Sequence, residues 1–283
     1  MRWLLKQVSG QRFDELPSIA QKWVGPFYWL LFNRRRIMFE NLSYVFPDWN
    51  MDQKKEMARK SLFYMLLAIL DTIWWYEWVH RERERSRNWL LNQCIKFSEV
   101  RSRDLILERG GLVCTAHYGT FPGVAQYFAF HKPTGVFLKR IKNSYLQTWA
   151  DKIIREMGLI PLYINEIGSI KKARNILKSG GVLVVLLDQH FGKKGRIKVE
   201  FFNRPAFAAG GAVELSMRMN KPVVAMFCYR GEGDITVIDK GVLWERGGDV
   251  PVREIVQSFT TSLESVIMSN PEQWAWLHRR WKV

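Results

Sequence analysis

Hydrophobic and polar positions divide the chain into two parts with different periodicity. From about residue 110, short apolar runs alternate with segments in which apolar residues recur every three or four positions. Apolar runs bounded by glycine or proline predict buried strands, and the wider spacing predicts amphipathic helices. The predicted strands lie in GGLVCTAH, TGVFLKR, GGVLVVLLD, KPVVAMFCY and DITVID. This alternation predicts an α/β fold with a mostly parallel central sheet flanked by helices.

The helical segments have clear boundaries. Residues 143–158 place Leu146, Trp149, Ile153 and Met157 on one stripe, and SIKKARNILKSGG ends in the glycines typical of a helix C-terminus. Residues 1–100 carry helical patterns throughout. We therefore expect a helical N-terminal region over 1–100 and an α/β core over 101–283, packed together as one compact unit.

Charge and aromatic content point to an anionic surface. The chain has 43 Lys and Arg against 27 Asp and Glu, a net charge of +16, together with 13 Trp and 17 Phe. The segment WVGPFYWLLF at 23–32 lies between Lys22 and Arg34–Arg36, as in proteins that sit at lipid head groups. A core helix with solvated ends is the alternative. We expect the N-terminal region to associate with a membrane, and not with nucleic acid, because no recognition motif is present.

Two further apolar segments allow more than one interpretation. Residues 62–79 approach the length of a membrane span, but Asp71 lies in mid-run, where an acid costs about 2.5 to 3.5 kcal/mol. We therefore interpret this segment as a buried or interfacial helix. The tail QWAWLHRRWKV either docks on the core or anchors the protein at an interface.

Residue spacing argues against several site classes. Cys94, Cys114 and Cys228 are too few and too far apart to suggest a disulfide framework or a zinc site. Neither the phosphate-binding G-x-x-x-x-G-K pattern nor the dinucleotide-binding G-x-G-x-x-G pattern occurs. No metal or nucleotide cofactor is expected.

Polar residues with catalytic potential follow two of the predicted strands. His117 ends one strand, and Asp188 and His190 end another that shares its Gly-Gly start. Ligands bind at the carboxyl ends of parallel strands, so these side chains are expected at one edge. A neutral imidazole can take a proton from a hydroxyl when a carboxylate orients it. The alternatives are a buried structural histidine and an aspartate that caps a helix or pairs in a loop.

Several longer motifs carry a resemblance to a known family. They are RRRIMFENLSYVFPDW, the His117 stretch, the 143–158 helix, DQHFGKKG with VEFFNRPAFAAGG, and PEQWAWLHRRWK. Together they resemble the lipid A late acyltransferases, the lauroyl and myristoyl transferases of the wider lysophospholipid acyltransferase superfamily. The resemblance implies acyl transfer from acyl carrier protein, an acidic partner, to a hydroxyl of a lipid A precursor. It also implies a peripheral or monotopic location on the cytoplasmic side of the inner membrane.

The resemblance also assigns site residues. The family pairs a histidine with an acid after four intervening residues; His117 matches the histidine, but Pro122 stands at the acid's place. We expect Asp188 to replace that acid. Arg155 matches a family arginine on the helix before the second Gly-Gly strand, and would hold the anionic substrate or the developing oxyanion unless it is an ordinary surface arginine.

Basic and polar residues after the strand ends complete the predicted site. They would cradle a phosphorylated sugar or a phosphopantetheine arm, although such charge runs are usually solvated. The predicted substrate-binding residues are Lys139, Arg140, Gln189, His190, Lys194 and Arg204.

Pro122 leaves two alternatives to fatty acyl transfer. One is transfer of a carrier-bound aminoacyl group, such as glycyl, to lipid A, because members of one superfamily can change donor while keeping the scaffold. The other is a non-catalytic, membrane-binding homologue.

Overall fold

The computed structural model describes residues 8, 10–164, 166–190 and 196–281, and its centre is a seven-stranded sheet. The strand order is β1-β9-β8-β2-β5-β3-β4, and every pairing is parallel except β8 with β9. This confirms the predicted α/β class with a mostly parallel sheet. The strands are β1 (Ile95–Phe97), β2 (Gly111–Thr115), β3 (Thr134–Leu138), β4 (Leu159–Tyr163), β5 (Val182–Leu186), β8 (Val223–Arg230) and β9 (Ile235–Trp244).

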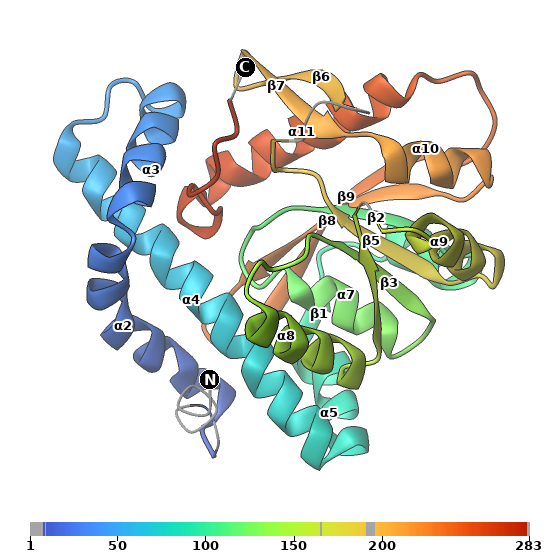
Figure 1. Cartoon of the computed structure of the whole chain (residues 1–283), viewed down its shortest axis with the longest axis horizontal. Helices are drawn as coiled ribbons and strands as arrows, with labels where there is room; N and C mark the ends of the chain where they lie inside the picture. Colours follow the sequence, from blue (N-terminus) through green and yellow to red (C-terminus); the bar gives the residue numbers. More distant parts are fainter. Residues whose placement is uncertain (1–7, 9, 165, 191–195, 282–283) are drawn as a thin grey trace.

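Helices form an N-terminal layer and cover both faces of the sheet (Figure 1). The N-terminal helices are α2 (Leu16–Leu30), α3 (Phe32–Val45), α4 (Met51–Arg81) and α5 (Arg83–Trp89). Those of the sheet region are α6 (Arg101–Arg109), α7 (Pro122–Ala129), α8 (Ser144–Glu156), α9 (Ser169–Lys178), α10 (Gly211–Arg218) and α11 (Val252–Ser269). Short helical turns occupy Phe13–Glu15, Leu90–Cys94 and Pro271–Gln273.

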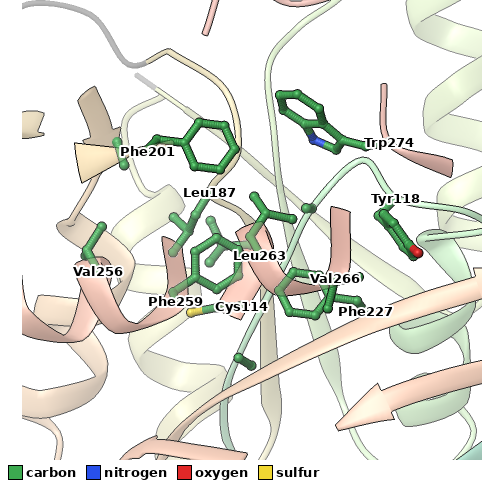
Figure 2. Close-up of a cluster of buried hydrophobic side chains, with 14 of the residues drawn as sticks. Cys114, Tyr118, Leu187, Phe201, Phe227, Val256, Phe259, Leu263, Val266 and Trp274 are labelled. Atoms are coloured by element: carbon green, nitrogen blue, oxygen red, sulfur yellow. The ribbon is translucent and has the colours of Figure 1, made fainter. Parts of the chain in front are cut away.

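Successive side chains of the central strands enter two separate apolar layers. In β2, Leu112 and Cys114 pack with the layer that includes α9, α10 and α11, whereas Val113 packs with α7 and α8. This two-sided burial explains why the strands are continuously apolar. Figure 2 shows Phe259 and Leu263 of α11 gathered with Cys114 and other apolar side chains of the first layer.

Four strands, β1, β4, β6 and β7, were not predicted from the pattern. β4 contains Pro161, which normally argues against a strand, but β4 is an edge of the sheet, where a missing N–H is tolerated. The hairpin β6 (Arg196–Phe201) and β7 (Arg204–Ala209) turns through Phe202 and Asn203, both with positive φ, as a two-residue primed turn requires. The fourth, β1, is only three residues long.

The long helix α4 is built into the fold. Met51–Val79 is long and apolar enough to cross a membrane by length and composition, yet 56% of its most apolar window is buried inside the protein. Asp71 and Arg230 of β8 form an ion pair with Oδ2 and Nε 2.9 Å apart and both side chains fully buried. Thr120 donates a 2.6 Å hydrogen bond to the same oxygen. Asp71 therefore fastens α4 to the sheet.

The Asp71–Arg230 pair supplies a stability test. Arg230→Met leaves the Asp71 carboxylate buried without its cation, and breaking one side of a buried pair costs about 3 to 5 kcal/mol. We expect the free energy of unfolding, measured by urea denaturation, to fall by that amount.

The double variant Asp71→Leu/Arg230→Met removes both charges and is expected to recover most of the loss. Single and double variants that are equally unstable would show that lost packing, and not the unpaired charge, causes the effect.

Candidate active site

Strand register brings His117 and Asp188 together. β2 and β5 are parallel neighbours in which Thr115 lies opposite Leu186, so the residues two positions further on, His117 and Asp188, emerge side by side. His117 Nδ1 lies 2.9 Å from Asp188 Oδ1, and the backbone N–H of His117 donates to Oδ2 at 3.0 Å. The carboxylate fixes the imidazole with its Nε2 directed away from Asp188.

Asp188 is fully buried and held by three donors. Besides the two groups of His117, the indole Nε1–H of Trp274 donates to Oδ2 at 3.0 Å. Burial by itself would raise the pKa of Asp188, but the charge and hydrogen bonds of His117 and the charge of His278 outweigh burial and hold this pKa well below its usual range. Asp188 is therefore a carboxylate at every pH near neutrality.

The far side of the His117 ring contacts Gln189 and His278. The Gln189 Nε2 amide lies 3.1 Å from His117 Nε2 and 3.1 Å from His278 Nε2, and the centroids of the two imidazole rings are 5.0 Å apart. Burial lowers the pKa of His278 to about 4, with a further contribution from the charge of His117. His278 is therefore neutral at pH 7, so its ring nitrogen can accept an amide N–H.

His117 stands at the wall of an apolar cavity of about 460 Å³. One side of this cavity comes from α4, including Ala68 and Ile69, and the opposite side comes from α8, including Trp149 and Ile153. Of the predicted apolar stripe, Trp149 and Ile153 line the cavity and Met157 lies in the core, whereas Leu146 is 40% exposed. A cavity with these walls suits a hydrocarbon chain whose reactive end lies at His117.

Local geometry explains the residues that follow His117. Gly119 has φ +50°, and a Cβ there would lie 2.0 Å from the backbone oxygen of Cys228, so only glycine fits. Pro122 is the first residue of α7, a position that favours proline, and it lines the apolar cavity. The place of the family acid is therefore apolar in this protein, while Asp188, two residues after the end of β5, contacts His117.

Three of the basic residues predicted for the site have no described contact with His117. Arg155 is exposed on α8 and is not among the residues that line the His117 cavity. Lys139 is exposed after β3, and Arg140 forms an ion pair with Glu166 while lying over the ring of Tyr163. The structure does not bring these three cations to His117.

The remaining predicted residues are divided between two places. Gln189 contacts His117 directly, whereas the ring of His190 lies 6.1 Å from that of Phe207 in the β6–β7 hairpin. Arg204 lies 4.4 Å above the ring of Tyr44 on α3. Lys194 falls outside the described residues.

Two site residues, Trp274 and His278, come from the C-terminal segment. The pattern of strands in the sequence does not predict where this segment lies. Trp274 and Trp276 are completely buried, so the tail docks on the core through these tryptophans. The dense aromatic and basic sequence QWAWLHRR was the available signal for His278, but it says nothing about which group the segment meets. Within the described residues, no group of three or more His, Cys, Asp or Glu side chains could hold a metal ion.

The neutrality of His278 predicts a pH dependence of stability. The unfolded chain protonates this residue near pH 6.5 and the folded protein only near pH 4, so between these values the unfolded state binds the extra proton. The free energy of unfolding should therefore fall by up to about 3 kcal/mol as the pH decreases from 6.5 to 4.

The variant His278→Gln removes this titration. Urea denaturation at pH 7 and pH 4.5 should show a smaller acid-induced loss for the variant than for the parent protein. Equal losses in the two proteins would contradict the assignment of a lowered pKa to His278.

Sequence comparisons agree with the resemblance. Residues 14–283 match the profile of the family described as "Bacterial lipid A biosynthesis acyltransferase". The "Lipid A biosynthesis lauroyltransferase" of Escherichia coli (strain K12) is 23% identical over 259 residues, which cover 88% of this chain and 79% of that protein. The match covers His117, Asp188 and the whole central sheet, and the chain therefore belongs to the bacterial lipid A biosynthesis acyltransferase family.

Proposed function

We propose that the protein transfers a fatty acyl group from a carrier-protein thioester to a hydroxyl of a lipid A precursor. The observation that carries this proposal is the placement of His117, oriented by the Asp188 carboxylate, at the wall of a large apolar cavity. The cavity takes the acyl chain, and the imidazole acts on the hydroxyl beside the thioester carbon. Because the thioester is already activated, the reaction needs no metal or nucleotide.

In the proposed mechanism, His117 is the general base. The acceptor hydroxyl replaces the Gln189 amide at His117 Nε2 and gives its proton to this nitrogen as its oxygen bonds to the thioester carbon. The carbon–sulfur bond then breaks, and the leaving sulfur takes the proton from Nε2. Asp188 stays ionised throughout and stabilises the imidazolium.

Gln189 is the nearest donor for the developing oxyanion. Its Nε2 amide lies between the Nε2 atoms of His117 and His278, so displacement from His117 leaves an N–H beside the reacting carbon. A donor that is already oriented stabilises charge in the transition state without reorganisation. We assign Gln189 this role in the reaction.

The cavity distinguishes the proposed donor from the aminoacyl alternative. A glycyl group carries a charged amine and no hydrocarbon, so apolar walls such as Ile69, Trp149 and Ile153 would cost it hydration without any compensating contact. A fatty chain gains from every methylene that it buries there. The apolar lining therefore favours a fatty acyl donor.

We place the protein on the cytoplasmic side of the inner membrane as a peripheral or monotopic protein. Trp29 and Phe32 are 71% and 69% exposed at the junction of α2 and α3, close to three consecutive arginines. Exposed aromatic rings beside arginines fit the boundary between lipid chains and head groups. The net charge of +16 also favours an acidic carrier protein as the donor's partner.

Substitutions of the paired residues test the mechanism. His117→Ala removes the base and should lower the transfer rate by about 10²- to 10⁴-fold. Asp188→Asn loses the carboxylate that fixes the imidazole tautomer and should cost a similar factor. The measurement is acyl transfer from fatty acyl–carrier protein to the lipid A precursor, followed by mass spectrometry of the lipid.

The control is Asp104→Asn on the exposed side of α6, which should keep the parent rate. Label that reaches the lipid only from an aminoacyl carrier protein would overturn the fatty acyl donor. Lipid modification in cells that survives His117→Ala would overturn the catalytic role, leaving a membrane-binding homologue as the better interpretation.

Filling the cavity should change the preferred chain length. Ala150→Phe adds a ring to the α8 wall, and each methylene excluded from such a pocket is worth about 1 to 3 kcal/mol. We expect kcat/KM for long-chain donors to fall at least about tenfold, whereas short-chain donors keep the parent value.

Thr148→Phe places the same ring on the exposed side of α8 and is the matched control. A uniform loss for all chain lengths, or no loss in Ala150→Phe, would show that the cavity does not hold the acyl chain.

A further inference from the structure

A second, polar cleft lies between α3 and the C-terminal segment. It has a volume of about 340 Å³ and is separate in its lining residues from the apolar cavity at His117. One wall is a face of α3, and the other is formed by Arg279 and Trp281. The residues that line it are Asn33, Arg36, Ile37, Glu40, Asn41, Tyr44, Arg279 and Trp281.

The cleft carries an excess of positive charge. Arg36 and Arg279 line it, and Arg204 lies 4.4 Å above the ring of Tyr44, another lining residue. Glu40 is the acidic residue of the lining, and it pairs with Arg36 at 2.8 Å. Among the described residues Arg279 has no ion-pair partner, so its planar guanidinium is available to an external anion.

Direct contacts connect this cleft to His117. The side-chain amide of Asn41 donates to the backbone oxygens of Trp276 and His278, at 2.8 and 2.7 Å. The ring of His278 lies 5.0 Å from the ring of His117, and Arg279 is the next residue in the chain. The cleft and His117 are therefore linked through the C-terminal segment, in which Arg279 of the cleft wall follows directly on His278.

The surroundings of the cleft favour the head group of a lipid as its anionic ligand. Phe32 and Leu30, 69% and 76% exposed, precede Asn33 of the cleft, and Arg35 stacks on the Phe32 ring at 4.8 Å. Apolar side chains here can enter a membrane while arginines beside them stay at the level of the phosphates. The phosphopantetheine arm of a carrier protein is not embedded in a membrane, so its binding would not require exposed apolar side chains beside the cleft.

We propose that this cleft binds a phosphate group on the sugar head group of the acceptor lipid and thereby presents the lipid to His117. The inference rests on the acyl-transfer function proposed above and names where the acceptor is recognised. Arg36 and Arg279 hold the phosphate through charge-assisted hydrogen bonds, and the Tyr44 and Trp281 rings, whose centroids are 5.5 Å apart, form the aromatic part of the wall.

Binding measured without turnover tests the proposal. In full-length protein carrying His117→Ala, the added pair Arg36→Gln/Arg279→Gln should weaken binding of a phosphorylated lipid A precursor in detergent micelles at least about tenfold. For the same lipid after enzymatic removal of its phosphates, the cleft pair should change the affinity less than about twofold, because the substitutions remove only contacts to phosphate.

The matched control is Arg174→Gln/Arg218→Gln, which removes the same charge from exposed positions on α9 and α10. Unchanged binding in the cleft variant, or equal weakening in the control, would overturn the proposal. In the catalytically intact background, the cleft pair should raise KM for the acceptor and leave KM for acyl–carrier protein unchanged; the reverse result would assign the cleft to the donor and also overturn it.

The proposed reaction and the proposed site fail in different ways. Phosphate-dependent binding that is lost in the cleft variant supports the site even if the parent protein transfers no acyl group. Acyl transfer with an unchanged KM for the acceptor in the cleft variant would contradict the site and support the reaction.

Discussion

The hydrogen bond between His117 and Asp188 depends on the register of two neighbouring parallel strands. Thr115 and Leu186 are paired, so both functional side chains leave the sheet at the same height, 71 residues apart in sequence. A buried carboxylate is costly unless donors satisfy it, and two of its three donors come from His117 itself. The third donor, Trp274, requires the C-terminal segment to fold back over the end of the sheet.

The C-terminal segment lies where its side chains can contact the residues around His117. It carries Trp274 to Asp188 and His278 to Gln189, and Asn41 of α3 holds its backbone from the other side. Figure 1 shows the segment running between α3 and the β6–β7 hairpin. The N-terminal helices and the sheet are thus joined through the same few residues that surround His117, and the site is formed only when both are in place.

The parts of this arrangement that follow from local pattern could be predicted from the sequence. Continuous apolar runs predicted the mostly parallel sheet. The Gly-Gly pair that starts two of these strands led to the expectation that Asp188 lies near His117. The partners of exposed cations could not be predicted, because an arginine such as Arg140 binds whichever carboxylate the fold brings close, here Glu166. His278 and Trp274 contact site residues that are 86 or more positions away in the sequence. The periodicity of apolar residues carries no information about contacts at such a separation.

Helix α4 both lines the cavity and holds the buried ion pair, and it does so through residues within one helical turn. Ala68, Ile69 and Thr72 line the cavity, while Asp71, within the same turn, is locked in its buried pair with Arg230. Any drift of this helix that would widen or lengthen the cavity also pulls on the ion pair. Helix α8 has no buried ion pair among its described contacts and is tied to the sheet by hydrogen bonds, such as that of the buried Gln147 amide with the Tyr163 hydroxyl. Substitutions in the α8 wall are therefore expected to change the chain-length preference at a lower cost in stability.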